Sequence, residues 1–251
     1  MPASTIINAV IHAVHLSAHK PPAKVLDLSC GDGDILERLS GLGYSVEGTH
    51  YREDDYITKV QSPILKQATI HTGIDLNQPL PFEDAQYDIV LATEVLEHLP
   101  AHAPLLKEIG RILNDGGVFI FSTPNIHRLS SRVQFLFTGT HNMCGAYLGW
   151  HVAPDDLYST HFNPVYFPVI HTLLKHNELK VEKLGFTSGS FSMYLLFPFL
   201  YPFIAISTLI EVAPFWKRSK SGGKDLLRWL LSPVLLMSNQ LVVRSRKTST
   251  L

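Results

Sequence analysis

The stretch "LDLSCGDGD", residues 26–34, decides the fold of this 251-residue chain. An apolar run ends in a loop that contains Gly31 and Gly33, and a helical pattern begins at Asp34. A dinucleotide-binding fingerprint would need a third glycine where this chain has Leu36, and a P-loop would need Gly-Lys-Ser/Thr. The loop therefore favours a ligand that the backbone approaches closely and that carries no pyrophosphate, such as an adenosyl compound. The alternative is a purely steric role of the two glycines in a tight turn between a strand and a helix.

Outward from this loop, strand-like and helix-like segments alternate along the chain. Apolar strand patterns lie at 23–30, 44–50, 67–74, 87–95, 118–124, 180–189 and 240–248. Helical patterns lie at 34–43, 102–117 and 165–179, and residues 1–20 form an amphipathic helix without the charged start of a signal peptide. The alternation predicts an α/β fold with a doubly wound, mostly parallel, seven-stranded sheet and an apolar helical insertion before the last strand.

Composition limits the class of protein. The formal net charge is −1, and no basic stripe runs over the predicted core, so nucleic acid is an unlikely partner. Cys30 and Cys144 are too few for a disulfide framework or a Cys-type zinc site, which indicates a reducing, cytoplasmic compartment.

Two further stretches define a family resemblance. "GIDLNQPLPFEDAQYDIVLATEVLEHLP" (73–100) and "LLKEIGRILNDGGVFIFSTPN" (105–125) follow the glycine loop in order. Together these motifs resemble class I S-adenosylmethionine-dependent methyltransferases, including small-molecule enzymes of ubiquinone, lipid and polysaccharide pathways. The resemblance covers most of residues 23–189 and implies a Rossmann-like fold, S-adenosyl-L-methionine as cofactor, and an antiparallel last strand at "QLVVRSRK" (240–247).

The resemblance also implies roles for single residues at the cofactor site. The methionine part of the cofactor matches the first motif, with Asp27, Ser29, Gly31 and Gly33. Asp75, with the backbone of Leu76, matches the position that binds the adenine amino group, and Glu94 matches a position that lines the pocket. His50 stands where the family usually has an acid that accepts hydrogen bonds from both ribose hydroxyls. Because an imidazole cannot accept two such bonds, either His50 shares the ribose with Tyr51 or an acid of "REDDY" (52–56) reaches back.

The catalytic candidates follow the fourth predicted strand. "EVLEH" (94–98) supplies two carboxylates and an imidazole within one turn, and a second imidazole comes from "YSTHFNP" (158–164). One hypothesis is a metal-free general base, His98 or His161. The other is a divalent ion held by four side chains, as in enzymes that methylate the 3′ end of small RNAs: Glu94, Glu97, His98 and His161. His127 and His151 are weaker candidates, since each lies in a loop-like stretch where a solvated histidine is common.

The chain is predicted to be divided into a methyltransferase core at 1–189 and 240–251, an acceptor-binding or lid segment at 126–160 within it, and an insertion at 190–239. Phe135, Phe137, Tyr147 and Trp150 make the acceptor segment aromatic, although they equally fit a small satellite core.

Inside the insertion, "FSMYLLFPFLYPFIAISTLI" (191–210) has no charge, and "KDLLRWLLSPVLLM" (224–237) places Lys224, Arg228 and Ser232 on one face of a predicted helix. If the insertion crossed the membrane twice, the basic residues around 217–224 would lie on the far side, against the tendency of basic loops to stay in the cytoplasm. A monotopic segment in the plane of the membrane is therefore favoured. The alternative is a homodimer interface of the same composition.

These features predict methyl transfer, with oxygen as the favoured acceptor atom. The acceptor is predicted to be a membrane-associated small molecule, a lipid or a lipid-linked glycan at the inner face of a membrane. Two alternatives stay open: a metal-assisted RNA 2′-O-methyltransferase, and a non-catalytic, membrane-bound partner protein with a methyltransferase fold.

Overall fold

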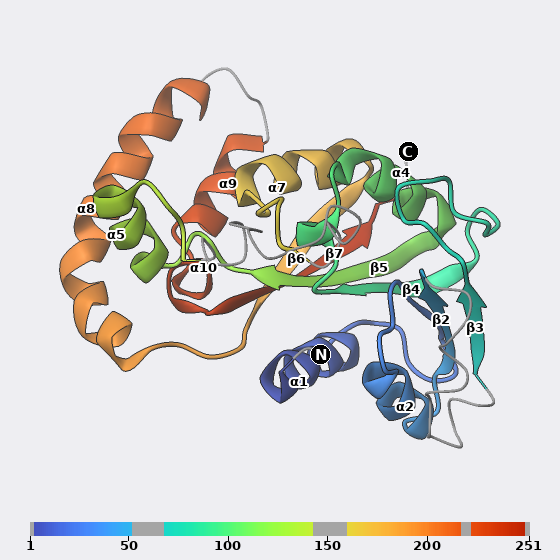
Figure 1. Ribbon diagram of the computed structural model, residues 1–251. Coiled ribbons are helices and arrows are strands. Elements are labelled where there is room, and N and C mark those ends of the chain that lie inside the picture. The colour runs from blue at the N-terminus through green and yellow to red at the C-terminus, as the bar shows by residue number, and fades with distance from the viewer. Residues whose placement is uncertain (1–2, 52–67, 143–159, 217–221, 249–251) are drawn as a thin grey trace.

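A computed structural model describes residues 3–51, 68–142, 160–216 and 222–248. Its sheet has the strand order β3-β2-β1-β4-β5-β7-β6 (Figure 1). The strands are β1 (Lys24–Asp27), β2 (Ser45–His50), β3 (Thr69–Thr72), β4 (Tyr87–Thr93), β5 (Leu113–Pro124), β6 (Leu179–Phe186) and β7 (Gln240–Lys247). Strands β1 to β5 pair in parallel, and β7 runs antiparallel to both β5 and β6. The predicted doubly wound, mostly parallel, seven-stranded sheet is confirmed.

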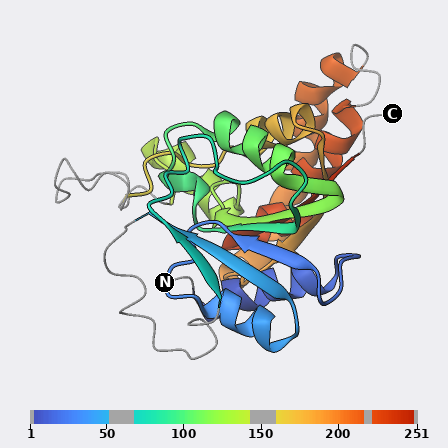
Figure 2. The same ribbon diagram turned by 90° about the vertical axis from the view of Figure 1, so that its right-hand side faces the viewer.

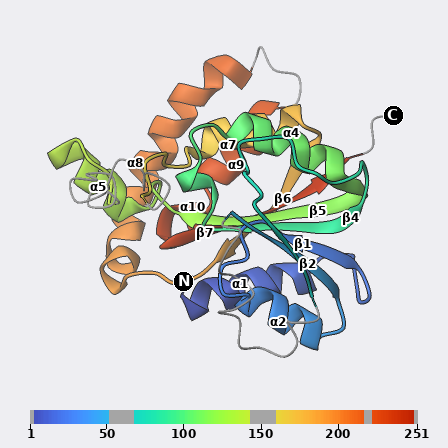
Figure 3. The same cartoon turned by 45° about the vertical axis from the view of Figure 1, so that its right-hand side comes forward.

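Helices cover both faces of the sheet, as Figure 3 shows for α1 and α2 on one side and α4 and α7 on the other. Their bounds are α1 (Ser4–His15), α2 (Asp34–Gly41), α4 (His102–Ile112) and α7 (Phe167–His176). Strand β4 is buried on both faces: Ile89 and Leu91 pack with α1 and α2, whereas Val90 and Ala92 belong to the core that includes α4 and α7. This is the reason for its unbroken apolar sequence.

The parallel strands bring their carboxyl ends to one edge of the sheet. Figure 2 shows the same sheet turned by 90°. Asp27, His50 and Thr93 end β1, β2 and β4, and Pro124 ends β5. Ligands of doubly wound sheets bind beyond this edge, where the strand order reverses between β1 and β4. The predicted cofactor residues therefore converge there.

Residues between β6 and β7 form α8 (Phe191–Trp216), α9 (Gly222–Leu230) and α10 (Pro233–Met237). Helix α8 lies beside α5 (Leu129–Thr138), the helix that follows the carboxyl end of β5 (Figure 1). Residues Met193–Val212 of α8 are long and apolar enough to cross a membrane by length and composition, with a mean hydropathy of 1.9, and of their described side chains only Met193 is buried.

The second half of the insertion departs from the prediction. The single helix expected over 224–237 is two helices: α9 ends at Leu230, and Ser232 caps α10, where its Oγ accepts a hydrogen bond from the Val234 backbone at 3.3 Å. Trp229, Leu235 and Leu236 are buried against the rest of the protein. The prediction that this segment presents its leucines and Trp229 to a membrane is therefore wrong; exposed apolar side chains of the insertion lie on α8.

Candidate active site

The glycine loop is held open by backbone conformations that few residues adopt. Ser29, Gly31 and Gly33 all have positive φ angles, of 63°, 54° and 85°. The loop is tied to β2, since the Ser29 backbone donates to Thr49 Oγ1 and the Cys30 backbone donates to the Thr49 carbonyl, both at 3.0 Å. Glycine adopts such angles at no steric cost, whereas Ser29 is strained, and a strained residue of this kind is common where a backbone wraps a ligand. The loop is thus shaped in advance for a close approach.

Asp27, at the end of β1, is a buried acid without a hydrogen-bond partner on one oxygen. Its side chain is 2 % exposed, and Oδ1 accepts no hydrogen bond among the described residues. Burial raises the pKa of Asp27 to about 8. A buried, unsatisfied polar atom at a ligand-binding edge is typical of a group that a ligand completes.

His50 and Asp75 lie on connected backbone. The carbonyl of His50, at the end of β2, accepts from the Ile74 backbone at 3.1 Å. Asp75 Oδ1 accepts from the backbone and the side-chain amide of Asn77, at 2.9 and 2.8 Å, which fixes the turn after β3. Leu76 packs against the core beside it. The acids of segment 52–56 lie outside the described residues.

Glu94 follows β4 in a left-handed conformation, with a φ of 54°. Its backbone nitrogen donates to Ser122 Oγ at 3.1 Å, and its Oε1 accepts from the same hydroxyl at 2.7 Å. Burial raises the pKa of Glu94, and the bond from Ser122 opposes this rise. Glu94 is therefore held against β5.

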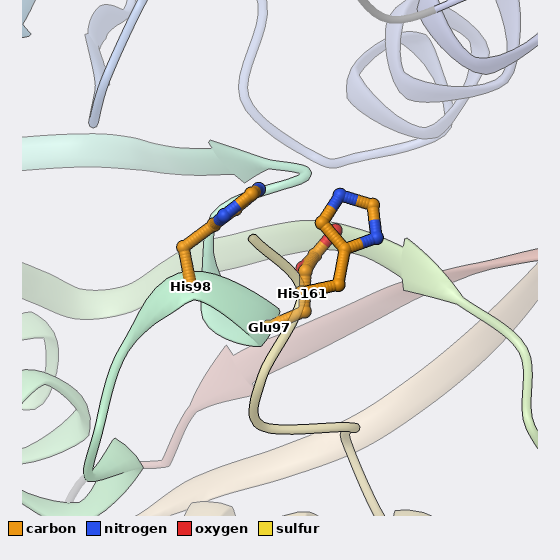
Figure 4. A group of neighbouring side chains, drawn as sticks. All are labelled: Glu97, His98 and His161. Atoms are coloured by element: carbon orange, nitrogen blue, oxygen red, sulfur yellow. The ribbon is translucent and has the colours of Figure 1, made fainter. Parts of the chain in front are cut away.

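Glu97, His98 and His161 form a compact cluster next to it, on the short helix η1 (Leu96–His98) and the segment before α7 (Figure 4). Potential ligand atoms of the three side chains lie within 4.8 Å of one another. Glu97 is fully buried, and neither of its carboxylate oxygens has a hydrogen-bond partner among the described residues. Burial, and secondly the Glu94 carboxylate, raises the pKa of Glu97 to about 8.

The two imidazoles of the cluster are oriented for base chemistry. His98 Nδ1 lies 3.0 Å from the Thr160 carbonyl, so Nδ1 is assigned as the donor and Nε2 carries the lone pair. His161 packs edge to face on His98, with ring centroids 4.6 Å apart. Burial, and secondly His98, lowers the pKa of His161, which favours its neutral form. A neutral imidazole can accept a proton near pH 7.

The structure sorts the other predicted residues. Three of the four metal candidates come together, and Glu94 is not among them. His127, expected to be solvated, is buried: its Nε2 accepts from the Phe167 backbone at 2.9 Å, and burial lowers its pKa to about 3. Phe135 and Phe137 are exposed on α5. His151, Tyr147 and Trp150 lie outside the described residues.

Sequence reasoning overlooked one feature near this edge. Arg128 and Arg132 occupy the start of α5, four residues apart, which places them on one face of a helix. The spacing in "HRLSSR" (127–132) was the available signal.

Comparison with known proteins agrees with this geometry. The methyltransferase domain family matches residues 4–183, and the chain belongs to that family. A ubiquinone biosynthesis O-methyltransferase of Burkholderia vietnamiensis is 28 % identical over 109 residues, which are 43 % of this chain and 47 % of that protein. The match thus spans less than half the length of this relative.

Solved structures share the fold. A SAM-dependent methyltransferase from Archaeoglobus fulgidus has a TM-score of 0.57 and 14 % identity over 96 % of this chain and 93 % of that one. Phosphoethanolamine N-methyltransferase 2 of Haemonchus contortus, in complex with S-adenosyl-L-methionine, has a TM-score of 0.56 and 14 % identity over 98 % of this chain and 53 % of that one. The predicted class, a class I S-adenosylmethionine-dependent methyltransferase with S-adenosyl-L-methionine as cofactor, is confirmed.

Proposed function

We propose that this protein methylates a hydroxyl oxygen of a membrane-associated small molecule, a lipid or a lipid-linked glycan. The observation that carries the proposal is the pair of imidazoles, His98 and His161, beside the buried Glu97 at the carboxyl edge of β4. Methyl transfer to a hydroxyl needs an oriented acceptor and a group that takes its proton.

His98 is the proposed base. In the reaction, a lone pair of the acceptor oxygen forms a bond to the methyl carbon while the carbon–sulfur bond breaks. S-adenosylmethionine, when bound, would supply the methyl group and leave as S-adenosylhomocysteine, and the acceptor proton would pass to His98 Nε2. The Thr160 carbonyl accepts from Nδ1 and so holds the ring with Nε2 available for the proton.

Oxygen as the acceptor atom is supported by the curated relatives. Several ubiquinone biosynthesis O-methyltransferases match this chain at 28–30 % identity, over less than half of their length. An acceptor that is apolar, like a prenylated ring, would also suit a protein with an exposed apolar helix.

Helix α8 supports the membrane as the location of the acceptor. One side of α8, with Phe197, Leu200 and Ile204, packs on α5 and α10, whereas Phe199, Phe203 and Ile210 are 68, 72 and 69 % exposed. Both ends of the insertion return to neighbouring strands of one sheet, so α8 would lie in the plane of a membrane surface. Lys217, Arg218 and Lys220 follow it in the sequence and would favour an anionic, cytoplasmic leaflet. Burial of the same face in a homodimer is the competing arrangement.

The cluster also fits a divalent ion. Glu97 offers two unsatisfied buried oxygens, and two imidazoles with one carboxylate suit zinc or manganese better than magnesium. Glu97, His98 and His161 would hold the ion, which when bound lowers the pKa of a coordinated hydroxyl. Metal analysis after dialysis against zinc or manganese tests this: about one ion per chain in the wild type and none in Glu97→Gln would support the site, and equal content in both would exclude it.

The proposed function is tested by incubating the protein with methyl-labelled S-adenosylmethionine and a membrane extract. Protein-dependent label in the organic phase supports a lipid-like acceptor, and mass spectrometry then identifies the methylated atom. Label found in RNA alone would replace the proposal with the RNA methyltransferase. Binding of S-adenosylhomocysteine without transfer to any fraction would favour the non-catalytic partner protein.

A further inference from the structure

Two arginines share the first turn of α5, at the end of the segment that follows β5. Arg128 precedes the helix, and the Arg132 backbone nitrogen donates to the Arg128 carbonyl at 3.1 Å. Burial lowers the pKa of both guanidinium groups, and Arg132 is only partly accessible to solvent. Arginine nevertheless stays protonated in proteins. Two positive charges are therefore held at the start of α5, each in a partly desolvated place.

Neutral oxygens orient both side chains. Arg132 Nε donates to the His127 carbonyl at 2.7 Å. Arg128 Nη1 donates to Asn239 Oδ1, and in the amide orientation that satisfies both groups the Asn142 oxygen accepts from Arg128 Nε at 3.0 Å and from Nη2 at 2.7 Å. These contacts fix the guanidinium groups and leave their charge uncompensated. A partly buried charge in such a state is unfavourable unless a counter-charge arrives.

Neither arginine has a counter-ion within the part of the chain that the structure describes. Other arginines in that part of the chain do pair with carboxylates. Arg111 pairs with Glu108, and Arg246 pairs with Glu182. Arg128 and Arg132 have no such pair among the described residues, and the hydrogen bond described for Arg132 uses Nε, not its Nη donors. His127, Tyr166 and His141 are the ring neighbours, and none of them supplies a negative charge near pH 7. The site is complete except for an anion.

The arginines adjoin the candidate active site through one segment. The Thr160 carbonyl accepts from His98, and farther along the same segment the Phe167 backbone donates to His127, the residue before Arg128. On its other side, α5 contacts the exposed helix α8. A ligand held by the arginines would thus lie between the imidazole cluster and the apolar surface.

We propose that Arg128 and Arg132 bind a phosphate group of the methyl acceptor. The Nη donors of Arg132 match the oxygen geometry of a phosphate or diphosphate. The charge of Arg128, whose guanidinium is already hydrogen-bonded to Asn142 and Asn239, adds to the attraction. The inference deepens the proposed function, on which it rests, by naming the acceptor class: an amphiphile whose phosphate binds at α5 while its hydroxyl reaches His98.

The test measures binding rather than turnover, so that its failure is distinct from failure of the proposed function. Inorganic pyrophosphate is titrated into protein loaded with S-adenosylhomocysteine, for the wild type, Arg132→Gln, Arg132→Lys and Arg128→Gln. Lys180→Gln, which removes an exposed charge from β6, is the matched control. Affinity for S-adenosylhomocysteine and the melting temperature confirm that each variant is folded.

We expect Arg132→Gln and Arg128→Gln each to weaken pyrophosphate binding by about tenfold or more, as for the loss of a charge-assisted hydrogen bond. The pyrophosphate affinity of Arg132→Lys should lie between those of the wild type and Arg132→Gln. Lys180→Gln should bind pyrophosphate as the wild type does. Phosphatidylcholine vesicles with and without phosphatidic acid then distinguish the source of the phosphate group. If only the vesicles with phosphatidic acid compete with pyrophosphate, the phosphate is borne by a lipid; if neither competes, it is borne by a soluble molecule. Equal pyrophosphate binding by the wild type and the Arg128 and Arg132 variants, or none by the wild type, would overturn the proposal.

Discussion

The side chain of Leu36 occupies the space that a side chain at Gly48 would need. Leu36 Cδ1 and Cys30 Sγ both lie 2.8 Å from the position of a Cβ atom at Gly48. In dinucleotide-binding folds the third glycine of the loop lets the helix approach the strand. Here the helix carries a leucine, and the neighbouring strand β2 provides the missing space.

Gly48→Ala tests this relationship. The added methyl group forces Leu36 and Cys30 apart, so we expect a loss of about 1–3 kcal/mol in the free energy of unfolding. Gly41→Ala at the end of α2, where an added Cβ meets nothing within 4 Å, is the control and should be neutral or slightly stabilising. Urea denaturation measures both, and equal stabilities would show that the packing relaxes freely.

Asp75→Asn separates cofactor binding from turn formation. The amide keeps an oxygen for the Asn77 backbone but replaces the carboxylate predicted to accept from the adenine amino group. Loss of a charged hydrogen bond should weaken S-adenosylhomocysteine about 10- to 100-fold in calorimetric titration. Asn77→Ala, which loosens only the turn, should have a smaller effect. If both variants bind equally well, Asp75 does not contact the adenine.

His98→Ala should reduce turnover by roughly 10²- to 10⁴-fold, because it removes the group that takes the acceptor proton. Affinity for S-adenosylhomocysteine should stay unchanged. His176→Ala, an exposed histidine at the end of α7, is the control and should retain full turnover. Normal turnover of His98→Ala in the radiolabel assay would transfer the role of base to His161.

The buried acids predict an unusual dependence of stability on pH. Asp27 and Glu97 have pKa values raised to about 8, so the folded protein holds protons that the unfolded chain has released at neutral pH. The free energy of unfolding should therefore fall as the pH rises from roughly 5 to 8 and level off above that. Glu97→Gln should flatten this fall, and the exposed-site variant Glu83→Gln should not. Urea denaturation at the two ends of this pH range measures the change. If the pKa of Glu97 is not raised, the free energy of unfolding will change with pH equally in the wild type and in Glu97→Gln.

Helix α8 predicts binding to lipid vesicles. Phe203→Glu, at a side chain that is 72 % exposed, should lower vesicle binding about tenfold or more, because it removes buried apolar area and adds a charge. Leu42→Glu, at an exposed leucine that follows α2, should bind as the wild type does. Sedimentation with anionic vesicles measures both. If the wild type does not bind vesicles and is a dimer, and Phe203→Glu is a monomer, the exposed face of α8 belongs to a dimer interface.

The sequence by itself determined the sheet and the position of the site. The unbroken apolar run of β4 and the glycines after β1 are local signals, and parallel pairing carries the carboxyl ends of β1 to β5 to one edge. Glu97 and His98 were predicted from the same reasoning, since they follow the end of β4 within one turn.

Only the tertiary structure decided how side chains from distant segments meet. It places His161 on His98, turns Glu94 toward Ser122, and gives Arg128 and Arg132 neutral oxygens as partners among the described residues. It also buries Trp229, which the sequence placed on an exposed helix. Local patterns cannot predict such contacts, because the direction and burial of a side chain depend on which other segment packs against it.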